Sequence, residues 1–141
     1  AICRALSKKM GVIQYHLKIL EKHQLIRTMY DGRAKCFFDN CLENVAPEIR
    51  DSEKYQMRDH IFIQLRKNVP SQIIRFLAHN RQATNQQLAK LADISPQAIT
   101  YHIKNLSNLD MIRTTQKGRQ KFYQIRPIVH EILLEIKQRY E

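Results

Sequence analysis

The sequence predicts a mainly α-helical fold with small β-hairpins, built from two tandem copies of one module that a connecting helix joins. The first observation is an internal repeat. Residues 13–40 align with residues 99–126 at a constant offset of 86, and eleven of the 28 pairs are identical. The second is a helical apolar period before each hairpin, and the third is a glycine at each hairpin tip. Such a repeat indicates one supersecondary unit used twice.

The repeat also predicts the domain boundaries. Residues 1–46 form the first module, and its opening helix is missing because the sequence starts inside a helical pattern. Residues 47–69 are a connecting loop and helix, with the helix over Glu53–Asn68. Residues 70–141 are the second module and a closing helix. No stretch approaches the ~18 apolar residues of a membrane span, and no secretory signal is visible.

The second copy shows how a module is built. Its first helix is predicted over Pro70–His79, with proline in the first turn. A Thr-x-x-Gln capping box at Thr84–Gln87 starts the next helix, whose Leu88 and Leu91 should face the core. Ser95, followed by proline, is the expected N-cap of the third helix. Three helices therefore precede the second hairpin.

The helix before each hairpin has two different faces. Apolar residues at i, i+4 and i+7 form the core face; these are Ile13, Leu17 and Leu20 in the first copy and Ile99, Ile103 and Leu106 in the second. The opposite face is polar and can hydrogen-bond a base edge or a phosphate. Its candidate residues, with two histidines at the boundary of the core face, are Gln14, Tyr15, His16, Lys18, Gln97, Thr100, Tyr101, His102 and Lys104. The alternative for the tyrosines is packing, and for the histidines a hydrogen-bonded boundary position.

The hairpins are predicted as strands 25–30 and 35–40 in the first copy and 111–116 and 121–126 in the second. Two of the three glycines lie at their tips, where a positive φ is needed. The hairpins, or wings, carry basic residues, of which Arg33, Lys35, Arg119 and Lys121 are at the tips; the full set is Arg27, Arg33, Lys35, Arg113, Lys117, Arg119 and Lys121. Arginine suits a narrow minor groove or a phosphate. The alternative is a charged strand edge that blocks edge-to-edge pairing.

An amphipathic closing helix follows the second hairpin. Its apolar side chains are Ile128, Ile132, Leu133, Ile136 and Tyr140. The helix follows Pro127, and Ile128–Tyr140 could support a homodimer.

The net charge is +11 and the pI is about 9.8. Residues 1–46, 47–69 and 70–141 contribute +4, +1 and +6, so the excess lies in the two repeats. This distribution favours a polyanionic partner over a basic surface that only aids solubility.

The remaining chemistry of the sequence is sparse. Cys3, Cys36 and Cys41 have no CxxC spacing, which fits a reducing cytosol. They and the six histidines show no zinc spacing, so no metal site is expected. No nucleophile, acid/base pair or phosphate loop stands out, and we expect neither an enzyme nor a cofactor.

The segments YHLKILEKHQLIRTMYDGR and YHIKNLSNLDMIRTTQKGR resemble the YHL-x-x-L…LI…GR pattern of ArsR-like winged helix-turn-helix regulators. GVIQYHL is similar to the tandem winged-helix regulators of archaea, among them the euryarchaeal activators of archaellum genes. The resemblance implies a winged helix-turn-helix fold and transcription regulation. The paired cysteines of the metal-sensing branch are absent, which argues against metal sensing.

Together these features predict a regulator that binds double-stranded DNA at a promoter or operator, in the cytoplasm at the nucleoid. One α-helix fits the major groove, so each outer face would read bases while each wing contacts the backbone. The alternative is a winged-helix module that binds protein within the transcription machinery, since this fold is used in both ways.

Overall fold

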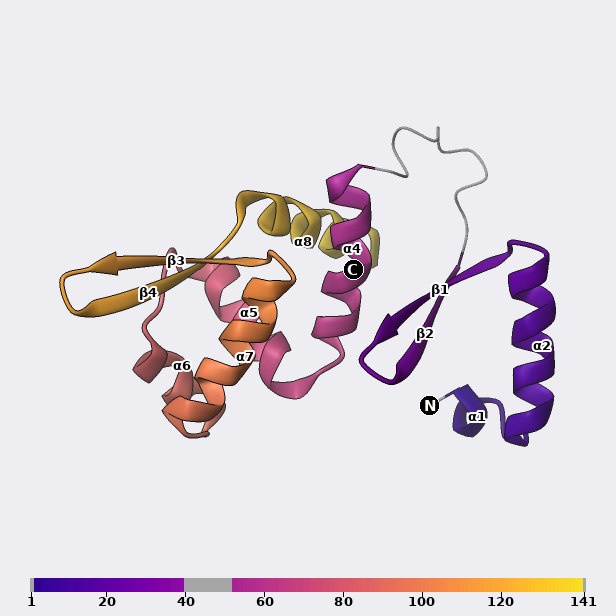
Figure 1. The fold of residues 1–141 in the computed structure, drawn as a ribbon. Helices are drawn as coiled ribbons and strands as arrows, with labels where there is room; N and C mark the ends of the chain where they lie inside the picture. The colour runs from indigo at the N-terminus through magenta and orange to yellow at the C-terminus, as the bar shows by residue number, and fades with distance from the viewer. Residues whose placement is uncertain (1, 40–51, 141) are drawn as a thin grey trace. The chain divides into compact units, whose positions relative to one another are not determined.

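The computed structural model describes residues 2–39 and 52–140 (Figure 1). The chain divides into two compact units, Ala1–Pro47 and Glu48–Glu141. Cys41 and the end of the predicted first hairpin at Asn40 lie outside the described residues.

The first unit is a short helix, a long helix and a hairpin. It consists of α1 (Ile2–Ala5), α2 (Met10–Lys22), β1 (Ile26–Asp31) and β2 (Ala34–Asp39). The two strands pair antiparallel. The predicted order of a helix followed by a hairpin is therefore present in this copy.

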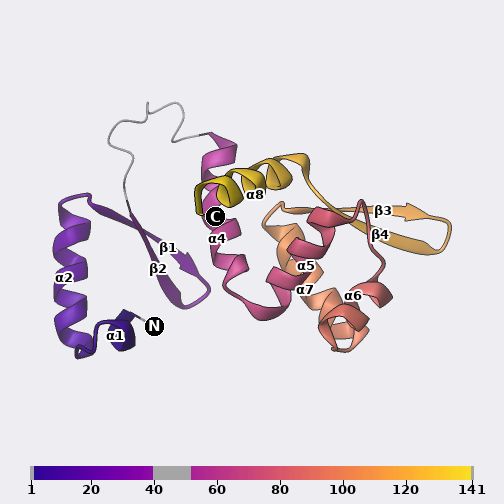
Figure 2. The ribbon, with the colours of Figure 1, turned by 180° about the vertical axis from the view of Figure 1, so that it is seen from behind.

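The second unit adds helices before and after the same helix and hairpin. Its elements are α4 (Glu53–Leu65), α5 (Asn68–His79), α6 (Asn85–Ala92), α7 (Pro96–Asn108), β3 (Ile112–Lys117), β4 (Gln120–Ile125) and α8 (Pro127–Tyr140). The caps are as predicted: Thr84 and Gln87 form a capping box, and the Ser95 hydroxyl accepts from the Ala98 N–H at 3.2 Å. The β3–β4 ribbon extends away from the helices in both views (Figures 1 and 2).

Both hairpins are tighter than predicted, and their strands are shifted by one residue. The paired residues closest to the turns are Asp31 with Ala34 and Lys117 with Gln120. Only a Gly-Arg pair is left in each turn, with φ of +59° at Gly32 and +62° at Gly118. A two-residue turn with glycine first matches the twist of the strands, so pairing continues to the tip.

The backbone repeats more closely than the side chains do. Among the described residues, six have a positive φ, and they form three pairs at the 86-residue offset: Ser7 and Asp93, Gln24 and Asp110, Gly32 and Gly118. Ser7 lies between α1 and α2, as Asp93 lies between α6 and α7. Gln24 and Asp110 directly follow the C-caps of α2 and α7. The structural repeat therefore extends upstream of residue 13.

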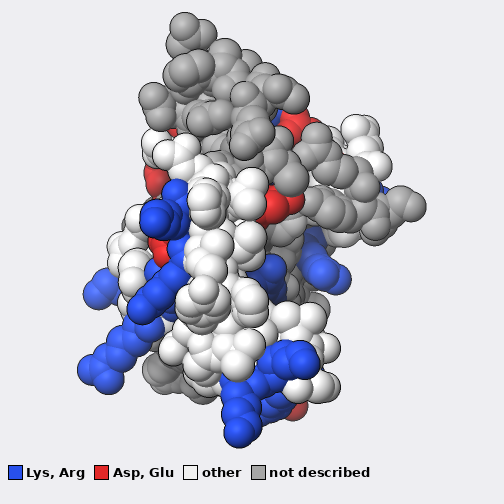
Figure 3. Space-filling model, turned by 90° about the vertical axis from the view of Figure 1, so that its right-hand side faces the viewer, with Lys and Arg blue, Asp and Glu red and all other residues white. Residues whose placement is uncertain are grey.

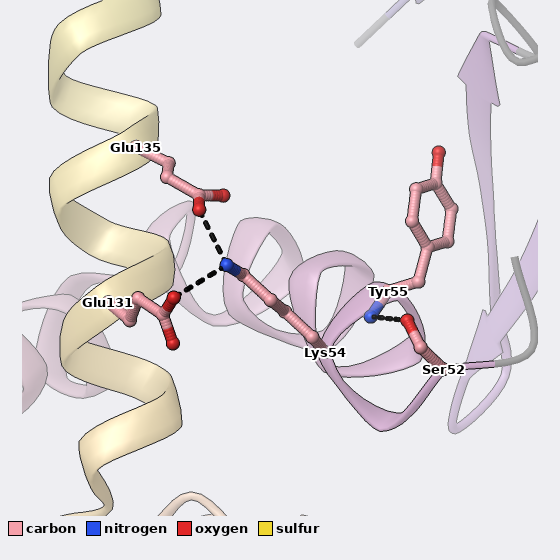
Figure 4. Close-up of polar contacts among 5 residues, drawn as sticks. All are labelled: Ser52, Lys54, Tyr55, Glu131 and Glu135. Atoms are coloured by element: carbon pink, nitrogen blue, oxygen red, sulfur yellow. Dashed lines mark hydrogen bonds and ion pairs between the residues drawn. The ribbon is translucent and has the colours of Figure 1, made fainter. Parts of the chain in front are cut away.

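The core of the second unit includes the predicted connecting helix. Met57 and Ile61 of α4 are buried in one cluster with Val129 and Ile132 of α8. Lys54 donates to Glu131 at 2.9 Å and to Glu135 at 2.6 Å across the same contact (Figure 4). The helix ends at Leu65 and α5 begins at Asn68, so the predicted boundary at 69/70 falls inside a helix. Helix α4 thus has a packing role in this unit.

The first unit has a thinner core. Ile13 is buried, but Leu17, expected to be largely buried, is half-buried, and so is Leu20. Leu25 is 52% exposed, whereas Met111 at the same repeat position is fully buried. In the second unit α5 packs against α7. No equivalent of α5 is present among the described residues of the first unit. Ile103 is buried as expected, whereas Leu17 is only half-buried for this reason.

One further apolar position was misjudged. Leu91 is 42% exposed, while Leu88 on the same helix is fully buried as predicted. Helix α6 is only eight residues long. Leu88 and Ala89 form the buried side of this short helix, and Leu91 lies on the side that faces solvent.

Candidate nucleic-acid interface

The two helices that precede the hairpins present the same aromatic pair. Tyr15 and Tyr101 are 62% and 64% exposed. Each ring lies edge-on to the following histidine, with centroids 5.5 Å apart for His16 and 5.4 Å for His102 and an interplanar angle of 72° in both. An exposed tyrosine held by a neighbouring ring can stack on a base or donate its hydroxyl to a phosphate.

The predicted outer faces are exposed. This holds for Gln14, His16 and Lys18 of α2 and for Gln97, Thr100 and Lys104 of α7. The Thr100 hydroxyl, however, donates to the Pro96 carbonyl at 3.0 Å and accepts from the Asn85 side chain at 2.9 Å. Its proton is thus already used, which weakens Thr100 as a base reader. Asn85, which links α6 to α7, was missed because only the fold brings it beside Thr100.

His102 differs from His16 in its surroundings. It is half-buried, and the pKa of its imidazole lies below the ordinary value because burial disfavours the charged form, with a smaller contribution from the positive charge of Lys67. His102 is therefore neutral at neutral pH and can both donate and accept a hydrogen bond.

A pH dependence of stability follows from His102. The unfolded chain takes up a proton near the ordinary value of 6.5, while the folded chain resists it, so the free energy of unfolding should fall as the pH drops through about 6.5. Urea unfolding at pH 7.5 and 5.5 would measure this loss. His102→Gln should reduce it. An unchanged loss in His102→Gln would show that another group titrates.

The wings place most of their predicted cations in solvent. Exposed side chains are Arg33, Arg113, Lys117, Arg119 and Lys121. Arg27 is half-buried, with its guanidinium 5.3 Å from the centre of the Phe38 ring, so it lies along the strands rather than at the tip. On the face of the molecule seen from the side of α2, Lys and Arg side chains cover more surface than Asp and Glu (Figure 3). The exposed tips can reach a polyanion.

Lys35 is engaged within the first unit. Its ammonium donates to both oxygens of Glu21, at 3.1 and 3.4 Å, and the Thr28 hydroxyl donates to the same carboxylate at 2.9 Å. The Lys35 hydrogen bond, followed by that of Thr28, keeps the pKa of Glu21 below its ordinary value. Sequence reasoning missed Glu21, because this carboxylate is fourteen residues from Lys35 and the two meet only when the ribbon folds onto α2.

A polar hollow of about 340 Å³ lies between the start of α6 and β4. Its lining consists of Gln82, Thr84, Gln86, Gln87, Lys90, Gln120 and Phe122. Amide groups and the Lys90 ammonium make it a donor-rich surface beside the second ribbon. The sequence pattern did not single it out, since its residues come from two distant segments.

The described ranges, 2–39 and 52–140, contain neither a candidate metal site nor a candidate membrane span. No group of three or more His, Cys, Asp or Glu side chains there could hold a metal ion. None of the helices there is both long and apolar enough to cross a membrane.

Comparisons with known proteins agree with this geometry. Residues 71–113, from α5 to the start of β3, match the family model of winged helix-turn-helix DNA-binding domains. Over 124 residues the chain is 23% identical to the uncharacterized HTH-type transcriptional regulator MJ1398 of Methanocaldococcus jannaschii, which covers 88% of this chain. The chain spans 28% of the length of that relative.

Solved structures show the same fold. HlyU from Vibrio cholerae N16961 has a TM-score of 0.51 and 18% identity, over 63% of this chain and 98% of HlyU. The homodimeric winged helix-turn-helix DNA-binding domain of Mb0332 from Mycobacterium bovis, described as a possible ArsR-family transcriptional regulator, has a TM-score of 0.52 and 13% identity, over 63% and 82%. Residues 71–113 thus match the winged helix-turn-helix DNA-binding domain, and over most of its length the chain is similar to an HTH-type transcriptional regulator.

Proposed function

We propose that the chain is a sequence-specific double-stranded DNA-binding regulator that uses two winged helix-turn-helix modules, each with one recognition helix and one basic wing. The observation that carries the proposal is the recurrence, in both units, of a helix with an exposed tyrosine edge-on to the following histidine and of a hairpin with a two-residue Gly-Arg turn. A helix whose outer face is polar can enter the major groove and read base edges there.

In the second unit, α7 is the proposed recognition helix. Residues near the start of such a helix contact base edges, which assigns that role to Gln97 and Tyr101. Lys104 lies one turn beyond Thr100 and suits a phosphate. The β3–β4 tip, with Arg119 and Lys121, would contact the backbone. Lys90, which lines the hollow beside this ribbon, would be a further cation that contacts the phosphate backbone.

In the first unit, Gln14, Tyr15 and Lys18 of α2 have the corresponding roles, and Arg33 is the cation at the tip. The outer faces differ, since glutamine at position 14 corresponds to Thr100. Two different heads in one chain suit an asymmetric DNA site, whereas two identical subunits suit a palindrome.

Phosphate contacts and base contacts should separate in binding measurements. Arg119→Ala and Lys121→Ala should weaken binding to specific and random duplexes alike, and each should flatten the log–log salt slope by about 0.9. Gln14→Ala and Gln97→Ala should instead cost about 1–3 kcal/mol per lost base contact on the specific duplex only.

The duplex for this test would come from selection of bound sequences out of a random pool, and fluorescence anisotropy at several salt concentrations would give the slopes. Thr100→Ala is a useful comparison, because its hydroxyl is bonded within the protein and its loss should discriminate less between sequences. Equal effects of the wing and helix substitutions on both duplexes would leave non-specific binding only.

A second candidate function is protein docking by the first unit, within the transcription machinery. It is favoured by the apolar side chains that this unit exposes: Leu6 at 57%, Met10 at 62% and Leu25 at 52%. DNA binding that is unaffected by Gln14→Ala and Lys18→Ala, yet depends on Gln97, would assign the first unit to this role.

A homodimer through Ile128–Tyr140 remains a further proposal. Val129 and Ile132 are buried in the second unit's own core, and Leu134 is a large apolar side chain of α8 that is 50% exposed. Sedimentation of the wild type and of Leu134→Asp would test it. The resemblance to activators of archaellum genes stays a prediction about the target promoters, and location at the nucleoid follows only if DNA binding is shown.

A further inference from the structure

The two wings hold their lysines in different ways. In the first unit the Lys35 ammonium is bound to the Glu21 carboxylate and lies 5.4 Å from the centre of the Phe37 ring. Thr28 donates to the same carboxylate, so Glu21 is fixed between the end of α2 and the ribbon. The lysine therefore points back toward the helix, along the side of the ribbon that faces α2.

The second unit has the same lysine and threonine but no carboxylate. At the 86-residue offset, Thr114 corresponds to Thr28 and Lys121 to Lys35, whereas Ser107 stands in place of Glu21. Lys121 is exposed, and no ion pair links it to any residue in the described part of the chain. The wing lysine is therefore held in an ion pair where the helix carries Glu21, and it is not held where the helix carries Ser107.

We propose that Glu21 attenuates the first wing: it holds Lys35 away from DNA phosphates, so that the first module contributes less backbone affinity than the second. This inference rests on the proposed DNA-binding function and assigns unequal roles to the two heads. Glu21 acts through Lys35 and is a positioning residue that makes no DNA contact of its own.

The physical reason is competition for one ammonium group. A phosphate oxygen and a carboxylate oxygen accept the same charge-assisted hydrogen bonds, and Glu21 already accepts two of the three that the Lys35 ammonium can donate, so Glu21 competes with the backbone for this group. The carboxylate would also stand close to the incoming phosphate with a like charge. Both effects lower the number of counterions that the first wing releases on binding.

The test uses the full 141-residue chain and a fluorescein-labelled 30-base-pair random-sequence duplex, with anisotropy measured between 50 and 300 mM salt. Glu21→Ser, which introduces the side chain of the second unit, should tighten binding at 0.1 M salt by roughly fivefold and steepen the log–log salt slope by about 0.9, the value for one added phosphate contact. Glu21→Gln should act in the same direction. Circular dichroism melting would verify that each variant is folded.

The reciprocal change tests the same idea in the other wing. Ser107→Glu places a carboxylate beside Lys121, and it should weaken binding by roughly fivefold and flatten the slope by about 0.9. Glu131→Gln is the matched control, because it removes one negative charge while Lys54 keeps its bond to Glu135. It should change binding by less than about twofold.

A Lys35→Ala background identifies the group that Glu21 controls. There Glu21→Ser should leave the salt slope unaltered, since no lysine is released, and a steeper slope would overturn the assignment to Lys35. If the wild type binds DNA, but the affinity of Glu21→Ser is within twofold of the wild-type affinity and its salt slope is equal, the inference alone is overturned. A wild-type chain without salt-dependent binding would overturn the proposed function and the inference with it.

Discussion

Leu106→Ala should lower the free energy of unfolding of the second unit by roughly 2–5 kcal/mol. Leu106 is fully buried, in one cluster with Ile61 of α4 and Ile73 of α5. Truncation to alanine removes apolar contacts and leaves a cavity that three packed helices cannot readily fill. Urea unfolding followed by circular dichroism would measure the loss as a lower midpoint of this unit's transition.

The repeat supplies the matched control. Leu20 occupies the same position in the first unit and has the same side chain, but it is half-buried. Leu20→Ala should therefore cost less than Leu106→Ala, because part of the leucine surface already faces water. Equal costs for the two substitutions would mean that the stripe on α2 is covered in solution as completely as the stripe on α7.

Insertion of five base pairs between the two halves of the selected DNA site should reduce affinity by on the order of 10², the gain that linking two binding modules commonly provides. Five base pairs turn one half-site by about half a turn of the duplex, which has 10–10.5 base pairs per turn. One head would then face the wrong side of the DNA. Competition binding against the uninterrupted site would measure the loss.

This prediction requires that both heads bind the DNA at once. The recognition helices should then lie roughly one turn of DNA apart, and the footprint should be about 15–25 base pairs. The length of α4 does not set that separation, because α4 is packed on α5 and α8 of the second unit. A ten-base-pair insertion, which restores the helical phase, should recover part of the affinity.

A variant in which Gln14, Tyr15 and Lys18 are all alanine serves as the control for the insertion. It should bind the interrupted and uninterrupted sites equally, since only the second head would remain. Indifference of the wild type to the five-base-pair insertion would show that the heads do not act together. The first unit would then fit the protein-docking role better.

Local chemistry explains what could be predicted from the sequence. A capping box such as Thr84–Gln87, and a serine before a proline at Ser95, satisfy backbone N–H groups within one turn, so these helix starts need no distant partner. Glycine at 32 and 118 determines the hairpin tips because of the positive φ there. The basic wings and the polar outer faces followed from similar short-range patterns, and the repeat followed from the likeness of two segments 86 residues apart.

Only the tertiary structure decided which of these groups are engaged. The pairing of Lys35 with Glu21, and of Thr100 with Asn85, depends on surfaces that meet after the ribbon and α6 have folded onto the helix before each hairpin. Helix α4 joined the core because α8 covers it, and Leu17 stayed half-buried because no counterpart of α5 lies on it among the described residues. Periodicity determines which face of a helix is apolar, but burial depends on what another segment places against that face.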